Sequence, residues 1–159
     1  YSAIYTRIRS ITQSEYSLKG REFEDFVLNL FDNQVGKLLV LKEWQGDKSL
    51  GKLKPESNKH PDFVFLYEGK EFAVECKWRK VLGTNLSKDL FPEKTLKNYR
   101  KFREERNIPV TIVLGVGGEP CAPEILYLIP LEKIDAVVSN TQSIVSFLND
   151  SCSISSLLP

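Results

Sequence analysis

The sequence contains two carboxylates and a lysine whose spacing suits metal-assisted hydrolysis. Asp62 follows a proline, and Glu75 and Lys77 stand two positions apart further along the chain. Carboxylate oxygens are the ligands that Mg²⁺ prefers, and Mg²⁺ held by Asp62 and Glu75 could activate a water and neutralise phosphoryl oxygens. Lys77 could orient or deprotonate that water, or act only as a cation that stabilises negative charge. The three residues indicate a metal site beside a cation that can contact a phosphate or a polarised water, with two roles open to Lys77.

A β-hairpin is predicted to carry these residues. Residues 62–67 and 72–78 are rich in strand formers and flank residues 68–71, whose Glu-Gly-Lys-Glu sequence indicates a tight turn. Side chains alternate between the two faces of a strand, so Glu75 and Lys77 project from the same face. The hairpin therefore positions both of them for one site.

The register of this hairpin is open between two alternatives. With Glu68-Gly69 as the turn, Asp62 lies opposite Glu75, whereas with Gly69-Lys70 as the turn it lies opposite Lys77. Both turns have an even length, so both registers place Asp62 on the face that carries Glu75 and Lys77.

A fourth candidate, Glu24, comes from an amphipathic helix predicted over residues 20–34. Glu24 falls on the flank of the apolar stripe, whereas Glu22 and Asp25 fall on the polar face. A carboxylate beside an apolar face costs free energy unless it is paired or binds a metal, so we expect Glu24 to point towards the sheet. The apolar stripe consists of Phe23, Phe26, Val27, Leu30 and Phe31.

These motifs resemble the PD-(D/E)XK nuclease superfamily, the restriction-endonuclease-like fold of Mrr-type restriction enzymes and Holliday-junction resolvases. The resemblance implies that Asp62 and Glu75 bind Mg²⁺, for which Mn²⁺ can substitute, and that Glu24 completes the metal shell directly or through water. It also implies that Lys77 aids the attacking water, and that the protein is a metal-dependent endonuclease acting on DNA. The matching segments are residues 20–27, Pro61-Asp62 and Glu75-Cys76-Lys77.

The order of the remaining elements predicts an α/β sandwich, with a central mixed sheet flanked by helices. This is also the three-layer architecture that the resemblance implies. Polar residues 45–61 indicate a long loop. The other predicted elements are a short strand at 38–41, a helix from Pro92 to about Arg106 with Leu96, Tyr99 and Phe102 on its inner side, strands at 110–116 and 125–129, and weaker helices at 131–138 and 143–149.

Positive charge is concentrated between Lys77 and Arg106, where ten basic and four acidic residues give +6 in a chain whose formal net charge is +1. Alone, this segment is more typical of a solvated helix with charge pairs. Its position directly after Lys77 favours contact with a nucleic-acid backbone. The candidate nucleic-acid contacts are Arg79, Lys80, Lys97, Arg100 and Lys101.

Four further residues lie in or near these motifs. Many members of the family have a Gln on the helix after the lysine, where this chain has Asn98 and Tyr99. His60 could touch the scissile phosphate or be an ordinary surface residue. Cys76 alternates away from its neighbours and is expected to pack in the core.

Length and composition bound the other expectations. A chain of 159 residues with 42% hydrophobic residues fits a single nuclease-like domain over residues 1–159, and because it begins at Tyr1 and lacks Met we expect it to belong to a longer chain. Three cysteines match neither a disulfide framework nor a zinc site, which favours a cytoplasmic location. We expect no membrane association and no organic cofactor.

Two competing interpretations stand beside the nuclease. One is a catalytically silent member of the same fold that holds nucleic acid or a protein partner without cutting. The other is a protein-interaction domain in which the hairpin charges lie on the surface, and it predicts no stabilisation by metal. Homodimers are common in the resembled family, although no segment of the sequence marks an interface.

Overall fold

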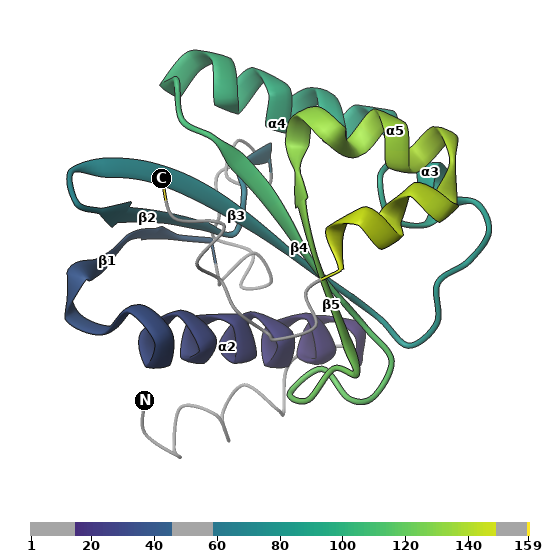
Figure 1. Ribbon diagram of the computed structural model, residues 1–159, viewed down its shortest axis with the longest axis horizontal. Coiled ribbons are helices and arrows are strands. Elements are labelled where there is room, and N and C mark those ends of the chain that lie inside the picture. Colours follow the sequence, from purple (N-terminus) through teal and green to yellow (C-terminus); the bar gives the residue numbers. More distant parts are fainter. Residues whose placement is uncertain (1–14, 46–58, 149–158) are drawn as a thin grey trace.

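The computed structural model describes residues 15–45, 59–148 and Pro159. It contains a five-stranded sheet in the order β1-β2-β3-β4-β5, with helices on both faces (Figure 1). The elements are α2 (Glu15–Val35), β1 (Leu39–Trp44), β2 (Phe63–Tyr67), β3 (Lys70–Arg79), α3 (Leu86–Asp89), α4 (Glu93–Arg106), β4 (Val110–Val116), β5 (Ile125–Pro130) and α5 (Ile134–Ser139), with short 3₁₀ helices at Gly36–Leu38, Leu131–Lys133 and Thr141–Phe147.

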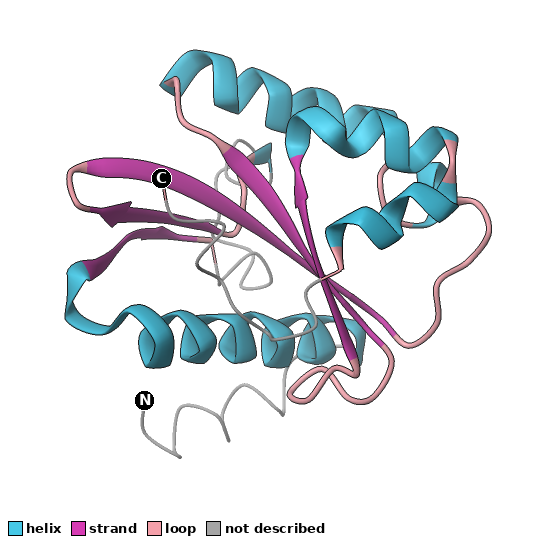
Figure 2. Ribbon diagram, in the orientation of Figure 1, coloured by secondary structure: helices cyan, strands magenta, loops and turns pink. Residues whose placement is uncertain are grey.

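The sheet is mixed, because β3 and β4 run parallel while the other neighbouring strands are antiparallel. A parallel neighbour requires a crossover, and α4 supplies it between β3 and β4. Helix α2 covers one face of the sheet, and α4 and α5 cover the other (Figures 1 and 2). The predicted α/β sandwich with a central mixed sheet is thus confirmed.

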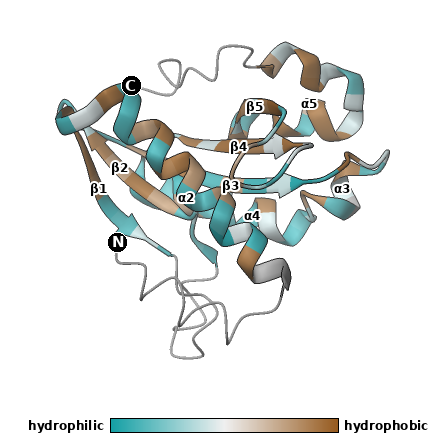
Figure 3. Ribbon diagram, turned by 90° about the horizontal axis from the view of Figure 1, so that it is seen from below, coloured by the Kyte–Doolittle hydropathy of each residue, from teal (hydrophilic) through white to brown (hydrophobic). Residues whose placement is uncertain are grey.

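Two hydrophobic cores lie on the two faces of the sheet, because strand side chains alternate between them. On one face Phe23 and Val27 of α2 pack with Phe63 and Val74. In Figure 3, apolar and polar residues alternate along α2, as expected of a helix with one buried side. The core on the other face joins α4 to the strands through Leu96, Tyr99, Phe102, Val64, Ala73, Ile112 and Leu114.

The turn between β2 and β3 decides the hairpin register. Tyr67 pairs with Lys70, and Glu68 and Gly69 have φ values of 48° and 78°. Two positive φ values in a two-residue loop are those of a type I′ turn, which matches the twist of paired strands. Because Phe63 pairs with Val74, this register places Asp62 opposite Glu75, the first of the two predicted alternatives.

Strand β1 runs further than predicted, to Trp44 instead of residue 41. The charged residues Lys42 and Glu43 interrupt the apolar run, so the sequence did not predict this extension of the strand. In the fold each of them has a partner of opposite charge. Lys42 pairs with Glu71 of β3, and Arg106 of α4 lies 2.7 Å from Glu43. A charged pair on a strand is therefore compatible with an edge position.

The C-terminal helices differ from the prediction mainly in their type. The segment that starts at Leu131 begins as a 3₁₀ turn and continues as α5, and the helix predicted at 143–149 is instead the 3₁₀ helix Thr141–Phe147. Asn140 separates the two, since its side chain accepts a hydrogen bond from the Gln142 backbone N–H at 3.1 Å. Helix α3 was not predicted.

Most of the loop predicted at 45–61 lies outside the described residues, as does residue 149. Among the helices that the structure describes, none is long and apolar enough to cross a membrane.

Candidate functional site

Two buried carboxylates lie side by side on the face of the sheet that α4 covers. Asp62 immediately precedes β2 and Glu75 lies opposite it on β3, and only 4% and 5% of their surfaces are exposed. Carboxylates are almost never buried so deeply unless they are paired or bind a metal. The prediction that Asp62 and Glu75 share a face is confirmed, and their burial marks the position as a candidate site.

Both carboxylates are held by neighbouring groups of the same hairpin. The Cys76 backbone N–H donates to Asp62 Oδ2 at 2.8 Å, which fixes the carboxylate at the start of β2 against β3. Lys77 Nζ donates to Glu75 Oε1 at 3.2 Å, and the Lys77 side chain is only 16% exposed. The structure thus brings together Asp62, Glu75 and Lys77, while the Cys76 side chain packs against the core beneath α2 as predicted.

Tyr99 of α4, which the sequence placed on the inner side of the helix and, with Asn98, where many members of the resembled family have Gln, adds a further group. It is buried, and its hydroxyl donates a hydrogen bond to Glu75. Burial raises the pKa of the Tyr99 hydroxyl far above its ordinary value, and the negative charges of Glu75 and Asp62 raise it further. The hydroxyl is therefore protonated and holds Glu75 from the helix side.

The signal for Tyr99 is present in the sequence. A buried tyrosine usually needs a partner for its hydroxyl, so a Tyr among Leu96 and Phe102 on the inner stripe indicates a polar group on the strand beneath it. The crossover from β3 to β4 places α4 above Glu75, so Glu75 is the polar group that Tyr99 contacts.

The donor set of Asp62 and Glu75 is suited to a hard divalent cation. Mg²⁺ is commonly bound by one or two carboxylates, with water and substrate phosphates completing its octahedral shell. Within residues 15–45 and 59–148, no three His, Cys, Asp or Glu side chains come together as a metal-binding group. The pair therefore fits a cation that also binds oxygens from outside the chain.

Glu24 lies on α2, which packs on the other face of the sheet from α4. Trp44 Nε1 of β1 donates to Glu24 Oε2 at 3.4 Å, and Arg21 NH1 lies 3.9 Å from the same oxygen. Arg21 is itself buried and lies over the Trp44 ring, 4.1 Å from its centroid. Glu24 thus contacts the sheet but forms no three-carboxylate group with Asp62 and Glu75. Its part in a metal shell, directly or through water, stays a prediction.

The basic residues predicted to contact nucleic acid lie in two places. Arg79 and Lys80 are exposed at the end of β3, where Arg79 donates to the carbonyl oxygens of Trp78 and Asp89. Lys80 Nζ donates to the Gly118 carbonyl oxygen at 2.6 Å. Both side chains could still present positive charge to a nucleic-acid strand that passes the C-terminal end of β3.

The other three basic residues lie on α4 and do not share one flank. Arg100 lies 2.6 Å from Asp135 of α5 and 3.3 Å from Glu93, so acids already neutralise it. Lys101 is exposed and pairs with Glu105 at 3.6 Å, and Lys97 is also exposed. Lys97 and Lys101 are therefore the more accessible of these three basic side chains, and their contact with phosphate stays a prediction.

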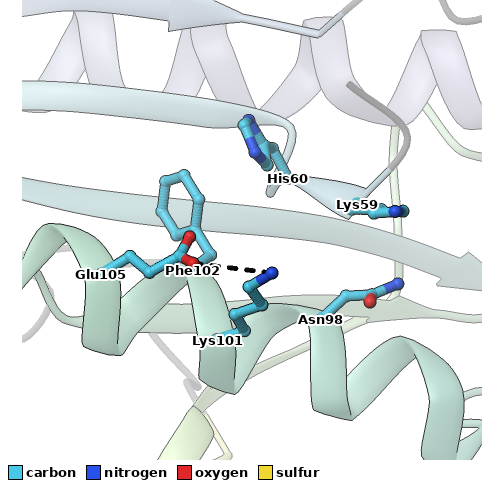
Figure 4. Close-up of a pocket in the computed structure, with 6 residues that line it drawn as sticks. All are labelled: Lys59, His60, Asn98, Lys101, Phe102 and Glu105. Atoms are coloured by element: carbon cyan, nitrogen blue, oxygen red, sulfur yellow. Dashed lines mark ion pairs between the residues drawn. The ribbon is translucent and has the colours of Figure 1, made fainter. Parts of the chain in front are cut away.

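A pocket of about 280 Å³ lies between α4 and residues 59–60 (Figure 4). We call it the His60 pocket. The His60 ring lies against Phe102, with 5.0 Å between the ring centroids. The pocket is lined by Lys59, His60, Asn98, Lys101, Phe102 and Glu105.

No family model and no curated protein matches the chain. A solved structure is similar, that of Hjc from Archaeoglobus fulgidus, a Holliday junction resolvase from an archaeal hyperthermophile. The identity is 19%, the match covers 69% of this chain and 77% of that chain, and the TM-score is 0.45.

Proposed function

We propose that this protein is a divalent-metal-dependent endonuclease that hydrolyses phosphodiester bonds in DNA. The observation that carries the proposal is the pair of buried carboxylates, Asp62 and Glu75, with the Lys77 ammonium 3.2 Å from Glu75. The single charge of Lys77 offsets only one of the two carboxylates, so a bound cation would offset the repulsion that remains in this poorly solvated site.

Asp62 and Glu75 would hold the cation, which supplies an activated water and neutralises the phosphoryl oxygens. The remaining steps belong to the chain's own groups. The Cys76 N–H and the Tyr99 hydroxyl fix the two carboxylates, so their oxygens are oriented before substrate arrives.

Lys77 acts beside this pair as a cation. Its ammonium already donates to Glu75, and such a donor can also hold an attacking water or a phosphoryl oxygen. Of the two roles that the sequence left open, this contact favours electrostatic stabilisation over proton abstraction.

The first experiment is cleavage of supercoiled plasmid and of a single-stranded DNA circle in Mg²⁺, Mn²⁺ or EDTA. We expect wild-type cleavage to require metal and to fall by about 100-fold or more in Asp62→Asn and Lys77→Ala, because each removes a charge from the reacting centre. Matched controls are Asp32→Asn and Lys70→Ala, which remove the same charges from exposed positions on α2 and at the β-turn.

Cleavage that survives in Asp62→Asn or continues in EDTA would contradict the proposal. If no variant cuts but the wild-type protein still binds DNA, the catalytically silent binding domain becomes the better account. The single-stranded circle shows which form of DNA is cut.

A further inference from the structure

We propose that the His60 pocket binds a backbone phosphate of the DNA strand, next to the phosphate that is cleaved. This inference rests on the proposed nuclease function and adds Lys59, His60 and Asn98 to the residues that contact DNA. Of the residues in this pocket, the sequence predicted Lys101 as a DNA contact and left His60 open between a contact with the scissile phosphate and an ordinary surface residue.

Each wall of the pocket is close in the chain to a residue of the carboxylate site. On one side His60 lies two residues before Asp62, and on the other Asn98 is the neighbour of Tyr99, whose hydroxyl binds Glu75. Phosphates along one strand of a duplex recur about every 3.4 Å of helix axis, so a strand held at the carboxylates presents further phosphates nearby. The pocket is placed to receive one of them.

The lining chemistry is that of a phosphate contact. Lys59 and Lys101 supply positive charge, and the Asn98 amide is a neutral hydrogen-bond donor. Figure 4 shows Lys101 and Asn98 extending from α4 towards residues 59–60, with Lys59 on the opposite side of the pocket. The Phe102 ring supports His60 from below, so the imidazole forms a wall of the pocket.

The size of the pocket is sufficient for a phosphate group. Its volume of about 280 Å³ is close to the lower limit of the range of roughly 300–1,000 Å³ that is usual for cofactor and drug sites. A phosphate with the adjoining sugar suits this space, and the rest of the strand would lie outside.

Glu105 is the one acid in the lining, and it opposes the binding of an anion. It lies 3.6 Å from Lys101, and both side chains are largely exposed, at 63% and 73%. An exposed pair of this kind is weak and easily exchanged, so a phosphate can replace Glu105 as the partner of Lys101. Glu105 therefore weakens the site without closing it, and removing its charge should strengthen binding.

The test is fluorescence anisotropy of a labelled DNA duplex, measured in EDTA over a series of NaCl concentrations. We expect Lys59→Ala and Lys101→Ala each to bind about 3- to 10-fold more weakly at low salt, and the slope of log K against log salt to become shallower by about 0.9 per lost phosphate contact. Glu105→Gln should bind about 2- to 5-fold more tightly, since it removes a competing anion.

The matched control is Lys37→Ala, which removes an exposed lysine after α2, on the other side of the sheet. Wild-type-like binding and salt slopes in both lysine variants, or no gain in Glu105→Gln, would overturn the inference. So would a wild-type protein that binds no duplex, or one that binds deoxyadenosine monophosphate as tightly as the duplex.

Failure of this inference can be told apart from failure of the proposed function. Binding is measured in EDTA, where metal-dependent cleavage does not proceed, and with variants that leave Asp62, Glu75 and Lys77 intact. Metal-dependent cleavage without an effect of Lys101→Ala on binding would contradict the proposal for the pocket and leave the proposed nuclease function intact. If the variants change DNA affinity as expected but the protein never cleaves DNA, the proposed nuclease function is contradicted and the proposal for the pocket is not.

Discussion

At the scale of single residues, the site is defined by how two buried acids are restrained. Asp62 is held by a backbone N–H, whereas Glu75 is held by two side chains, Lys77 and Tyr99, from different elements. Glu75 is therefore the carboxylate whose orientation depends on tertiary packing. Changing Tyr99 should affect the site without removing any of its charges.

We expect Tyr99→Phe to lower the rate of cleavage at saturating DNA by about 10-fold, a typical effect of one lost hydrogen bond to a charged group, with little change in affinity for DNA. The same variant has a distinct pH signature. The pKa of Tyr99 is raised in the folded protein by burial and by Glu75, so the unfolded chain loses this proton first as the pH rises.

The wild-type free energy of unfolding should thus fall above the ordinary tyrosine pKa of about 10, by about 1.4 kcal/mol per pH unit from this one group. Urea unfolding between pH 9 and pH 11, roughly spanning that pKa, measures it, and Tyr99→Phe should show the shallower decline. Equal slopes in the two proteins would show that the Tyr99 hydroxyl is not buried against Glu75.

The sequence was sufficient to place Asp62, Glu75 and Lys77 on one face, because alternation along a strand is a local rule. The role of Tyr99 was not accessible in this way, since it depends on where a crossover helix lies above β3. For Glu24 the sequence indicated its position at the flank of the helix, but not which face of the sheet α2 would cover.

At the scale of elements, the β2–β3 hairpin is the part that aligns the carboxylates, and its turn is strained. Glu68 has a φ of 48°, a left-handed conformation that most L-residues adopt only at a cost. The type I′ turn strongly prefers Asn at this position before Gly. A better turn residue should stabilise the register that the site needs.

Glu68→Asn is therefore expected to raise the free energy of unfolding by about 0.5–1 kcal/mol, which urea denaturation can measure. The side chain is exposed, so no packing is lost. Cleavage should be unchanged, since the register is already the one observed. Glu68→Val is the contrasting change, and a stabilising effect from this β-branched residue would contradict the strain argument.

The elements themselves were predictable where one physical signal dominated. The apolar stripe was sufficient to predict α2, and the unbroken apolar run was sufficient to predict β4. The end of β1 was missed because Lys42 and Glu43 are satisfied by charges from β3 and α4, which are distant in sequence. Helical turns were predicted for the C-terminal segment, but the earlier start of the second helix was missed because Asn140 caps a new turn there.

At the scale of the whole molecule, the sheet separates two packed cores, and the candidate site occupies a polar gap in one of them. Apolar residues of α4 and β4 surround Asp62 and Glu75 on that face. A cation bound there would interact with the folded protein alone, because unfolding separates the two carboxylates. Binding should thus appear as thermal stabilisation.

We expect Mg²⁺ or Mn²⁺ at about 100 times its Kd to stabilise the fold by about 2.7 kcal/mol. For a chain of this size that corresponds to a rise in Tm of about 5–10 °C. Differential scanning fluorimetry with metal and with EDTA checks it, and Asp62→Asn should lose most of the rise while Asp32→Asn keeps it. An equal rise in all three proteins would indicate that the metal binds elsewhere.

The parallel pairing of β3 with β4 also dictates an order of assembly. β2 and β3 join through a two-residue turn, whereas β4 can pair only after the chain from Arg79 to Val110, with α4 inside it, has been closed into a loop. Local pairing costs less chain entropy than closure of a long loop and proceeds sooner. During folding the acids are thus aligned first, and the tyrosine that restrains one of them arrives last, together with the helical wall of the His60 pocket.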